Sequence, residues 1–306
     1  MKNFVKLPYL IFFSIIVLVF ACNQSNNSES RKETILEGAT TILVDETLKP
    51  IIEDQIEVFE SFYKAKIKMD AKSETEVVQA LLKDSSSIAI LSRPLTTEEA
   101  NIFERKKISP KVTKFAIDAI AFIANKNDKD TLVALQDVVD FMQGKPKTNI
   151  KGLVFDNPNS STVRYMNELA GLKAIPENGI FSFKTNEDVI KFVSENKGMI
   201  GVVGLNWLSQ PAPAMKDYVQ KVNVLSVKNI NKEGFFGPTQ NNIAEGKYAL
   251  ARDLYIINCQ GFSGLGMGFA SFLAGEKGQR IILKSGLLPI RMPGRNFIIE
   301  KVKEKK

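Results

Sequence analysis

Residues 155–162 read FDNPNSST and connect a short apolar strand to a helix that begins near Val163. Ser160, Ser161 and Thr162 therefore place three consecutive hydroxyl groups at a helix N-terminus. Unpaired backbone N–H groups and the positive end of the helix dipole favour an oxyanion at such a position. A serine there is equally suited to capping the helix, so the local pattern leaves both interpretations open.

Outward from this stretch, strand-like and helix-like patterns alternate along the chain. Strands are expected where residues are continuously apolar or β-branched, and helices where apolar residues recur every three or four positions. The expected strands are residues 40–44, 88–91, 115–124, 153–155, 198–204 and 250–258; the expected helices are residues 48–62, 77–82, 135–141, 162–169 and 269–283; and the expected loops are residues 211–213 and 229–242. This alternation predicts an α/β fold in which parallel sheets are flanked by helices.

Two other turns between expected strands and helices carry polar side chains, and open α/β sheets bind ligands at such turns. Ser92 and Arg93 follow a buried strand. Arg93 either offers forked donors to an anion or is a surface residue. Asp45, Glu46 and Thr47 precede the first helix. The two acids suit a helix N-terminus without any ligand.

The N-terminus of the chain resembles a secretory signal, residues 1–22. Two lysines precede an uncharged apolar run at residues 7–20, which is shorter than the about 20 residues of a spanning helix. The sequence VFAC ending at Cys22 resembles a bacterial lipobox, in which this cysteine is acylated; an ordinary signal with an incidental cysteine is the alternative. Residues 23–33 contain no apolar side chain and predict a flexible tether. We therefore expect a cell-envelope protein, lipid-anchored outside the cytoplasmic membrane and facing the periplasm.

Composition argues against several kinds of chemistry. The 306 residues include no histidine, which removes the commonest metal ligand and the usual base of serine and cysteine hydrolases. With Cys22 acylated, Cys259 is left alone in an apolar strand, so neither a disulfide nor a zinc site is expected. The net charge is +7, but no Lys/Arg block is interleaved with aromatic residues, which disfavours nucleic acid as a partner. No cofactor and no metal are predicted, and a monomer is expected.

Eight motifs occur in the order found in the phosphate-binding proteins of bacterial ABC phosphate transporters. They are residues 40–50, 92–95 (SRPL), 117–125 (IDAIAFIAN), 135–145 (LQDVVDFMQGK), 159–162 (NSST), 198–203 (GMIGVV), 248–255 (YALARDLY) and 278–282 (GQRII). From about Thr40 to Ile290 the chain thus resembles this PstS-like family of type II periplasmic binding proteins. The ending at residues 278–290, close to the family pattern GQ-x-I-x-x-x-x-G-x-x-P, is among the best matches.

The resemblance implies a two-lobed fold, in which each lobe is a mostly parallel sheet flanked by helices and two crossing strands join the lobes. Residues 34–116 and 252–306 would form lobe one, residues 117–251 would form lobe two, and the ligand would be enclosed between them. The family binds phosphate with hydroxyls and backbone N–H groups at helix starts. The matching positions are Thr47, Ser92, Ser160 and Thr162, with Ser161 where the family has glycine.

The chain departs from the family pattern at the predicted site. Asp45 and Glu46 add carboxylates where the family usually has Gly-Ser-Thr-Thr before the first helix. Asp156 stands where the family usually has an arginine, and losing such a charged partner would weaken binding by about tenfold or more. Arg93 and Arg164 are close in sequence to the predicted site and are expected to restore its positive charge. Arg93 is the preferred replacement for the family's arginine.

The resemblance implies a solute-binding protein, not an enzyme, that captures inorganic phosphate or a related oxyanion for the permease of an ABC importer. One alternative is a lipoprotein of the same fold that binds another ligand or acts as a sensor or scaffold. The other is an extracytoplasmic hydrolase that uses Ser160. Neither a Gly-x-Ser-x-Gly elbow nor a Ser-x-x-Lys pattern surrounds this serine.

Overall fold

The computed structural model of the protein describes residues 33–84, 87–145 and 150–294. All of these except Glu33 belong to the unit that runs from Thr34 to Lys306. The predicted signal, its Cys22 and nearly all of the predicted tether lie outside the described residues. Among the residues that are described, no helix has the length and apolar character needed to cross a membrane.

The main sheet consists of parallel groups of strands on either side of two long antiparallel strands. Its order is β2 (Lys64–Lys72), β1 (Glu37–Asp45), β3 (Ile88–Leu91), β12 (Ala251–Asn258), β4 (Lys111–Asn125), β8 (Met199–Gly204), β6 (Gly152–Phe155) and β7 (Ile180–Ser182), and both β13 (Leu288–Pro289) and β9 (Val222–Val224) also pair with β4. β1 is parallel to β2 and β3, and β6 is parallel to β7 and β8. The predicted parallel sheets are thus confirmed.

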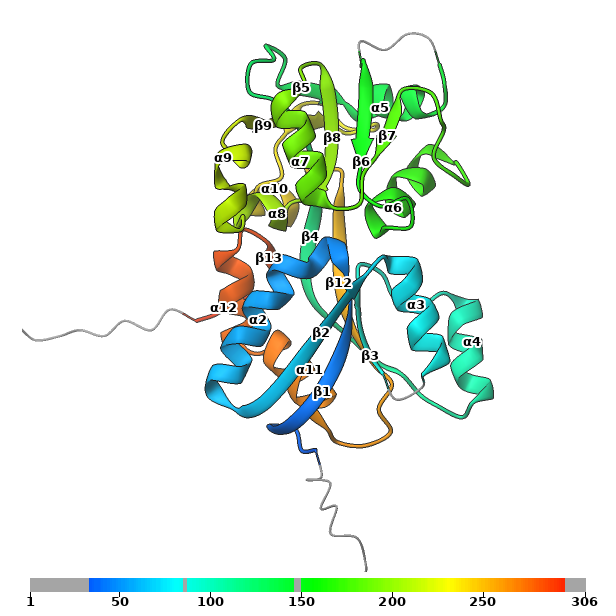
Figure 1. Cartoon of the computed structure of the whole chain (residues 1–306), viewed down its shortest axis with the longest axis vertical. Helices are drawn as coiled ribbons and strands as arrows, with labels where there is room; N and C mark the ends of the chain where they lie inside the picture. The colour runs from blue at the N-terminus through cyan, green and yellow to red at the C-terminus, as the bar shows by residue number, and fades with distance from the viewer. Residues whose placement is uncertain (1–32, 85–86, 146–149, 295–306) are drawn as a thin grey trace, which may run out of the picture. The chain divides into compact units, whose positions relative to one another are not determined.

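Strand β4 links the two parallel groups, as Figure 1 shows for β4 and its neighbour β12. Residues 111–119 of β4 pair with β12, whereas residues 120–125 pair with β8 and β9. β12 lies between β3 and β4 and is antiparallel to both. The fold is therefore the predicted two-lobed α/β arrangement with two crossing strands. The residue boundaries expected for the lobes remain a prediction.

Helices flank these strands throughout the described chain (Figure 1). Near β1 to β3 lie η1 (Glu46–Leu48), α2 (Lys49–Phe62), α3 (Glu74–Lys83), α4 (Thr97–Arg105), α11 (Leu265–Ala274) and α12 (Glu276–Lys284). Near β6 to β8 lie α5 (Leu135–Met142), α6 (Ser161–Ala170), α7 (Asn186–Glu195), α8 (Asn206–Ser209), η2 (Pro213–Met215), α9 (Lys216–Val219) and α10 (Gln240–Ala244). A separate small sheet has the order β11 (Phe235–Phe236), β10 (Ser226–Lys228), β5 (Leu132–Ala134).

Two expected elements differ in the structure. The helix expected at residues 269–283 is divided into α11 and α12 at Gly275. The chain turns sharply there, and a Cβ atom on Gly278 would lie only 2.3 Å from the carbonyl oxygen of Phe272, so the turn needs glycine at this close approach. The loop expected at residues 229–242 contains β11 and the start of α10. A two-residue strand and a five-residue helix are too short to show a hydrophobic period.

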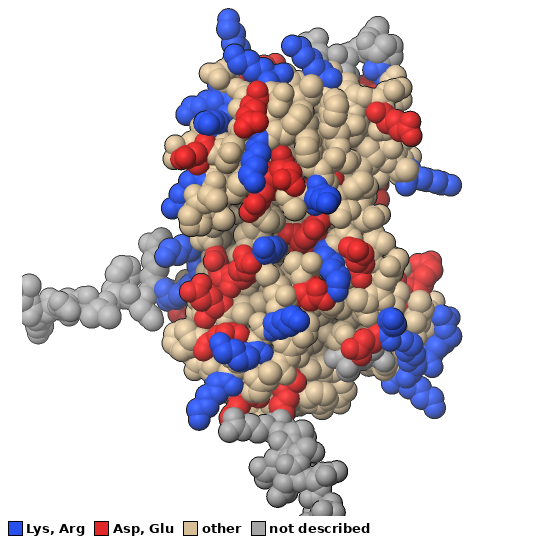
Figure 2. Space-filling model, in the orientation of Figure 1, with Lys and Arg blue, Asp and Glu red and all other residues tan. Residues whose placement is uncertain are grey.

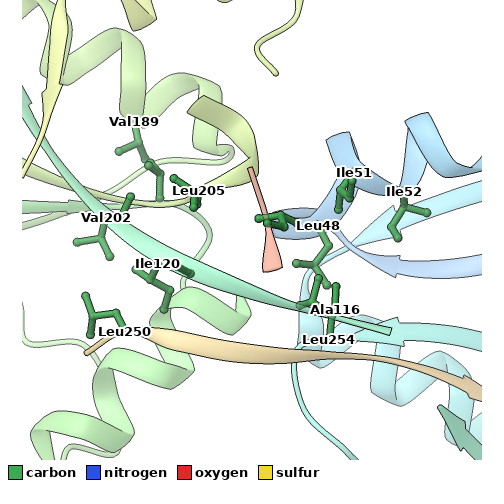
Figure 3. Packing of buried hydrophobic residues seen from close by; sticks show 14 of the residues in the cluster. Leu48, Ile51, Ile52, Ala116, Ile120, Val189, Val202, Leu205, Leu250 and Leu254 are labelled. Carbon is green, nitrogen blue, oxygen red and sulfur yellow. The ribbon is translucent and has the colours of Figure 1, made fainter. Parts of the chain in front are cut away.

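A hydrophobic cluster follows β4 and β12 and fixes η1 against them (Figure 3). Leu48 of η1, Ala116 of β4 and Leu254 of β12 are fully buried in it, as are Ile120 and Leu250. Burying one leucine side chain contributes about 1.5–3 kcal/mol. The short helix η1 is therefore held in place by its leucine, and this fixes the neighbouring Thr47.

Candidate functional site

Residues 155–162 form the predicted turn from β6 into α6. The Ser160 Oγ atom accepts a hydrogen bond of 3.2 Å from the Val163 N–H, so this serine is the helix cap. Its hydroxyl also donates to Asp156 Oδ1 over 2.6 Å, and Asp156 Oδ2 accepts from Asn186 Nδ2 over 2.9 Å. Ser161 begins the helix. The turn is thus a capped helix start in which a buried carboxylate holds the hydroxyl of the cap.

Three polar side chains from distant segments meet beside this helix start, and we call them the hydroxyl–arginine cluster: Thr47, Ser161 and Arg252. The hydroxyl oxygens of Thr47 and Ser161 are 2.9 Å apart and share a hydrogen bond. Arg252 donates from Nη1 to Ser161 Oγ over 2.9 Å and from Nη2 to Thr47 Oγ1 over 3.3 Å. All three are buried, so these contacts are protected from water.

Asp118 positions the arginine of this cluster. Arg252 of β12 is paired directly with Asp118 of β4 in the antiparallel register. The Nε and Nη2 atoms of Arg252 donate to Asp118 Oδ2 over 3.1 and 2.9 Å, and the two side chains are 1% and 0% exposed. Burial raises the pKa of Asp118, and the arginine opposes this rise. The ion pair therefore directs the guanidinium group at the two hydroxyls.

Thr47 is fixed through its backbone as well. Its carbonyl oxygen accepts hydrogen bonds from Asn206 Nδ2 and from Trp207 Nε1, each over 3.0 Å. Its N–H donates to Asp45 Oδ1 over 3.1 Å, which caps η1. Segments before α2 and at α8 therefore hold the threonine from both sides.

A second cluster, the Glu74 cluster, contains Glu74, Ser92, Arg93 and Arg164. Glu74 is 3% exposed; its Oε1 accepts from Arg93 Nε over 3.0 Å and from Arg164 Nε over 2.6 Å. Arg164 Nη2 also donates to Ser92 Oγ over 3.3 Å, and Arg93 forms a two-pronged ion pair with Glu99 at 2.8 Å for both contacts. This cluster joins α3 and the end of β3 to α6.

A groove of ≈ 480 Å³ opens beside the Glu74 cluster, and its lining includes Glu74, Arg93, Ser160 and Arg164. The side chain of Arg93 is 18% exposed and that of Arg164 is 25% exposed. Both arginines are therefore accessible from this groove, although both already contact carboxylates.

Three carboxyl groups near the hydroxyl–arginine cluster have pKa values above those of ordinary carboxyl groups. Burial, followed by the charge of Glu74, raises the pKa of Asp45 to about 6. Burial raises the pKa of Asp156 to about 7, and burial together with Asp45 raises that of Glu46 to about 7. One buried arginine near several acids does not neutralise them all, so burial makes these carboxyl groups easier to protonate than ordinary ones.

Several buried polar atoms of this region have no hydrogen-bond partner among the described residues. They include the hydroxyl of Thr162 and one carboxyl oxygen each of Asp45 (Oδ2) and Glu46 (Oε1). Thr162 is fully buried in the first turn of α6. Because buried polar groups are nearly always paired, these atoms are suited to contact a bound molecule.

The structure brings the predicted site residues into two neighbouring groups. Thr47 and Ser161 share the hydroxyl–arginine cluster, with Asp45, Glu46, Ser160 and Thr162 nearby in the same turns, while Ser92, Arg93 and Arg164 surround Glu74. Their contact with a ligand stays a prediction. Sequence reasoning missed Arg252, Asp118 and Glu74 as site residues. A signal existed for two of them, since Asp118 and Arg252 are charges inside apolar strands and buried charges need partners.

The chain is similar in sequence to a known family and to phosphate-binding proteins. Residues 26–277 match the model of a family described as the PBP superfamily domain. The phosphate-binding protein PstS of Borreliella burgdorferi is 26% identical over 311 residues, which cover 94% of this chain and 99% of that protein. A PstS of Staphylococcus epidermidis is 27% identical over 252 residues, covering 78% of this chain and 74% of the relative. These relatives confirm the predicted resemblance to phosphate-binding proteins.

Solved structures agree on the fold. A putative phosphate ABC transporter substrate-binding protein from Clostridium perfringens, solved with bound phosphate, superposes with a TM-score of 0.68 at 22% identity, covering 83% of this chain and 100% of that one. An ABC-type phosphate transport receptor from Vibrio cholerae gives a TM-score of 0.61 at 18% identity, covering 82% and 100%. Since the family model spans most of the chain, this protein belongs to the PBP superfamily.

Proposed function

We propose that this protein binds an oxyanion, above all inorganic phosphate, and delivers it to the permease of an ABC importer. The names of its curated relatives support this function. So does the hydroxyl–arginine cluster, because Thr47 and Ser161 occupy helix starts and face a buried cation, the combination that suits an anion. The proposed ligand-binding residues are Thr47, Ser92, Arg93, Ser160, Ser161 and Thr162, with Asp45, Glu46 and Arg164 as further candidates.

One observation carries the proposal furthest: the hydroxyl of Thr162. It is fully buried in the first turn of α6 and has no partner among the described residues. Leaving such a group unpaired costs about 1–3 kcal/mol, and an oxyanion oxygen placed at the helix start would supply the missing acceptor.

Thr162→Val tests this reading, since valine keeps the shape and removes the hydroxyl. We expect phosphate binding, measured by calorimetry, to weaken by about 5- to 10-fold, the equivalent of one hydrogen bond of about 1–1.4 kcal/mol. Stability to urea should not fall, because no internal hydrogen bond is lost. Thr41→Val on the exposed side of β1 is the matched control. Unchanged affinity of Thr162→Val would place the ligand elsewhere.

We further propose a binding role without catalysis. The Ser160 hydroxyl is directed at Asp156 and its oxygen caps α6, and the chain has no histidine to activate it. The protein would act outside the cytoplasmic membrane as a monomer, anchored by lipid on Cys22. Acidic and basic side chains are interspersed on the face drawn in Figure 2, which supports the proposal that nucleic acid is not a partner.

A ligand other than phosphate is the second candidate, and the presence of three acidic side chains at the predicted site, Asp45, Glu46 and Asp156, favours it. A site with this many acids is less hospitable to a dianion than one with an added arginine. Thermal shifts with phosphate, arsenate, sulfate and molybdate would separate the candidates. A shift with phosphate supports the first; a shift with another of these oxyanions and not with phosphate, or no shift with any of them, supports the second.

A further inference from the structure

The hydroxyl proton of Ser160 is already committed to a carboxylate. The proton of Ser160 is directed at Asp156 Oδ1 over 2.6 Å, because the serine oxygen itself accepts from the Val163 N–H. An oxyanion at the start of α6 needs hydroxyl protons directed at itself. While Asp156 is ionised, Ser160 cannot supply one.

The hydroxyl–arginine cluster has one hydroxyl proton that is not committed. Thr47 and Ser161 have two hydroxyl protons, and one of them lies in the 2.9 Å hydrogen bond between the two oxygens. Both oxygens also receive N–H groups of Arg252, so the second proton is free to point elsewhere. The Ser161 hydroxyl stabilises the ionised form of Asp45. Asp45 Oδ2 has no hydrogen-bond partner among the described residues, so this carboxyl group is still open to a proton.

We propose that the protein takes up protons on Asp45 and Asp156 when it binds an oxyanion, because an ionised Asp156 holds the Ser160 proton that the ligand needs and an ionised Asp45 leaves an unpaired, negatively charged oxygen beside it. This inference rests on the proposed function and gives Asp45 and Asp156 defined parts in it, Asp45 as a donor to the ligand and Asp156 as the group that releases the Ser160 proton. Both residues stand where the chain departs from the family pattern. When protonated, Asp45 and Asp156 act as hydrogen-bond donors, whereas their ionised forms would repel the ligand.

Protonation changes each hydrogen bond in a definite way. A neutral Asp156 donates its proton to Ser160 Oγ, which releases the serine proton for an oxyanion. Its other oxygen still accepts from Asn186. A neutral Asp45 keeps Oδ1 as the acceptor of the Thr47 N–H, and a proton on Oδ2, the oxygen without a partner among the described residues, would point at the ligand. The protons come from solvent.

The charges around these two groups support proton uptake. Asp45 faces Glu46 on its own segment, Glu74 on α3, and Arg252 on β12, while Arg252 is already paired with Asp118 on β4. Asp156 faces the uncharged Ser160 and Asn186, with Asp45, Glu46 and Arg252 contributing through space. Before a ligand arrives, the pKa values are already about 6 for Asp45 and about 7 for Asp156. An anion would raise both further.

Asp156→Asn is the decisive variant, because its amide imitates the neutral carboxyl group. The amide nitrogen can donate to Ser160 Oγ while the amide oxygen accepts from Asn186, so neither contact is lost. We would titrate the parent and the variant with inorganic phosphate by calorimetry at pH 5.5 and pH 8, in two buffers of different ionisation enthalpy. Asp137→Asn, at an exposed position of α5, is the matched control.

At pH 8 the variant should bind about tenfold more tightly than the parent, since a group with a pKa of about 7 must then be protonated at a tenfold penalty. At pH 5.5 the two should agree within about twofold. The parent should also take up more protons than the variant at pH 8, while phosphate's own ionisation is common to both. Asp45→Asn, whose amide oxygen can still accept from the Thr47 N–H, gives the same test if Asp156→Asn does not fold.

Parallel pH curves and equal proton uptake for the parent and both variants would overturn the inference and leave the proposed function intact. Absence of phosphate binding by the parent at both pH values would overturn the two together. A pH response of Asp137→Asn equal to that of Asp156→Asn would also overturn the inference, because it would reflect net charge and not these two positions.

Discussion

Replacing Arg252 by methionine should strongly destabilise the fold, because it leaves Asp118 as a buried, unneutralised carboxylate. The arginine makes four hydrogen bonds, two to Asp118 and one each to Thr47 and Ser161. Methionine fills a similar volume with none of them. Removing one partner of a buried ion pair costs about 3–5 kcal/mol, a large share of the about 5–15 kcal/mol that stabilises a typical domain.

The loss of stability in Arg252→Met should increase with pH. Burial already raises the pKa of Asp118 above its ordinary value of 3.8, and removing the arginine raises it further. A folded state that binds a proton more tightly than the unfolded state loses stability as pH rises through the folded-state pKa. Arg252→Met should therefore be more destabilised, relative to the parent, at pH 8 than at pH 5.

Urea unfolding at these two pH values, followed by the fluorescence of Trp207, measures the effect; this is the single tryptophan of the chain. The double variant Arg252→Met/Asp118→Leu should regain most of the stability, because the unpaired charge is gone. Arg280→Met, in an exposed pair with Glu276, should change stability by less than about 1 kcal/mol. A loss below about 1 kcal/mol for Arg252→Met at pH 8, or no recovery in the double variant, would refute the reasoning.

Three further changes test other parts of the molecule. Relative to the parent, Asp156→Asn should become more stable as pH rises from 4 to 8, by up to roughly 4 kcal/mol. The reason is that the pKa of Asp156 is about 7 in the folded parent, so its ionisation destabilises the parent's fold. Equal pH profiles of the two proteins in urea unfolding would contradict this. Gly278→Ala should lower the thermal midpoint by several degrees, because its Cβ would meet the carbonyl oxygen of Phe272 at 2.3 Å; an unchanged midpoint in calorimetry would show that the turn relaxes freely. Cys22→Ser should accumulate as an unprocessed precursor without lipid label; equal processing and labelling of parent and variant would rule out the anchor.

Much of the fold was predictable because local pattern and tertiary structure agree. The buried strand at residues 88–91 and the helix from Lys49 to Phe62 follow directly from continuous and periodic apolar residues. Strand β2 was not expected, since its sequence KAKIKMDAK alternates lysines with only a few apolar residues. Its parallel pairing with β1 stabilises it as a strand despite this composition.

The site was less predictable because its contacts join segments far apart in the chain. Hydroxyls at helix starts are visible in sequence, and Ser161 and Thr47 do meet. The arginine beside them comes from β12, and only the register of two crossing strands reveals that it faces Asp118. Glu74 is the N-terminal residue of α3, and in the sequence it is indistinguishable from an ordinary acid in the first turn of a helix. Only the fold shows that two arginines contact it.

The position of β12 also bears on how the chain reaches its fold. β3 ends at Leu91 and β4 at Asn125, yet the strand that lies between them begins only at Ala251. During synthesis the edges of β3 and β4 that β12 will cover stay unpaired until most of the chain has emerged. Pairing over such sequence separations makes folding slow and exposes strand edges to aggregation. We therefore expect truncation before residue 251 to leave an insoluble fragment, and chaperones that shield strand edges to matter more for this protein than for a small helical domain.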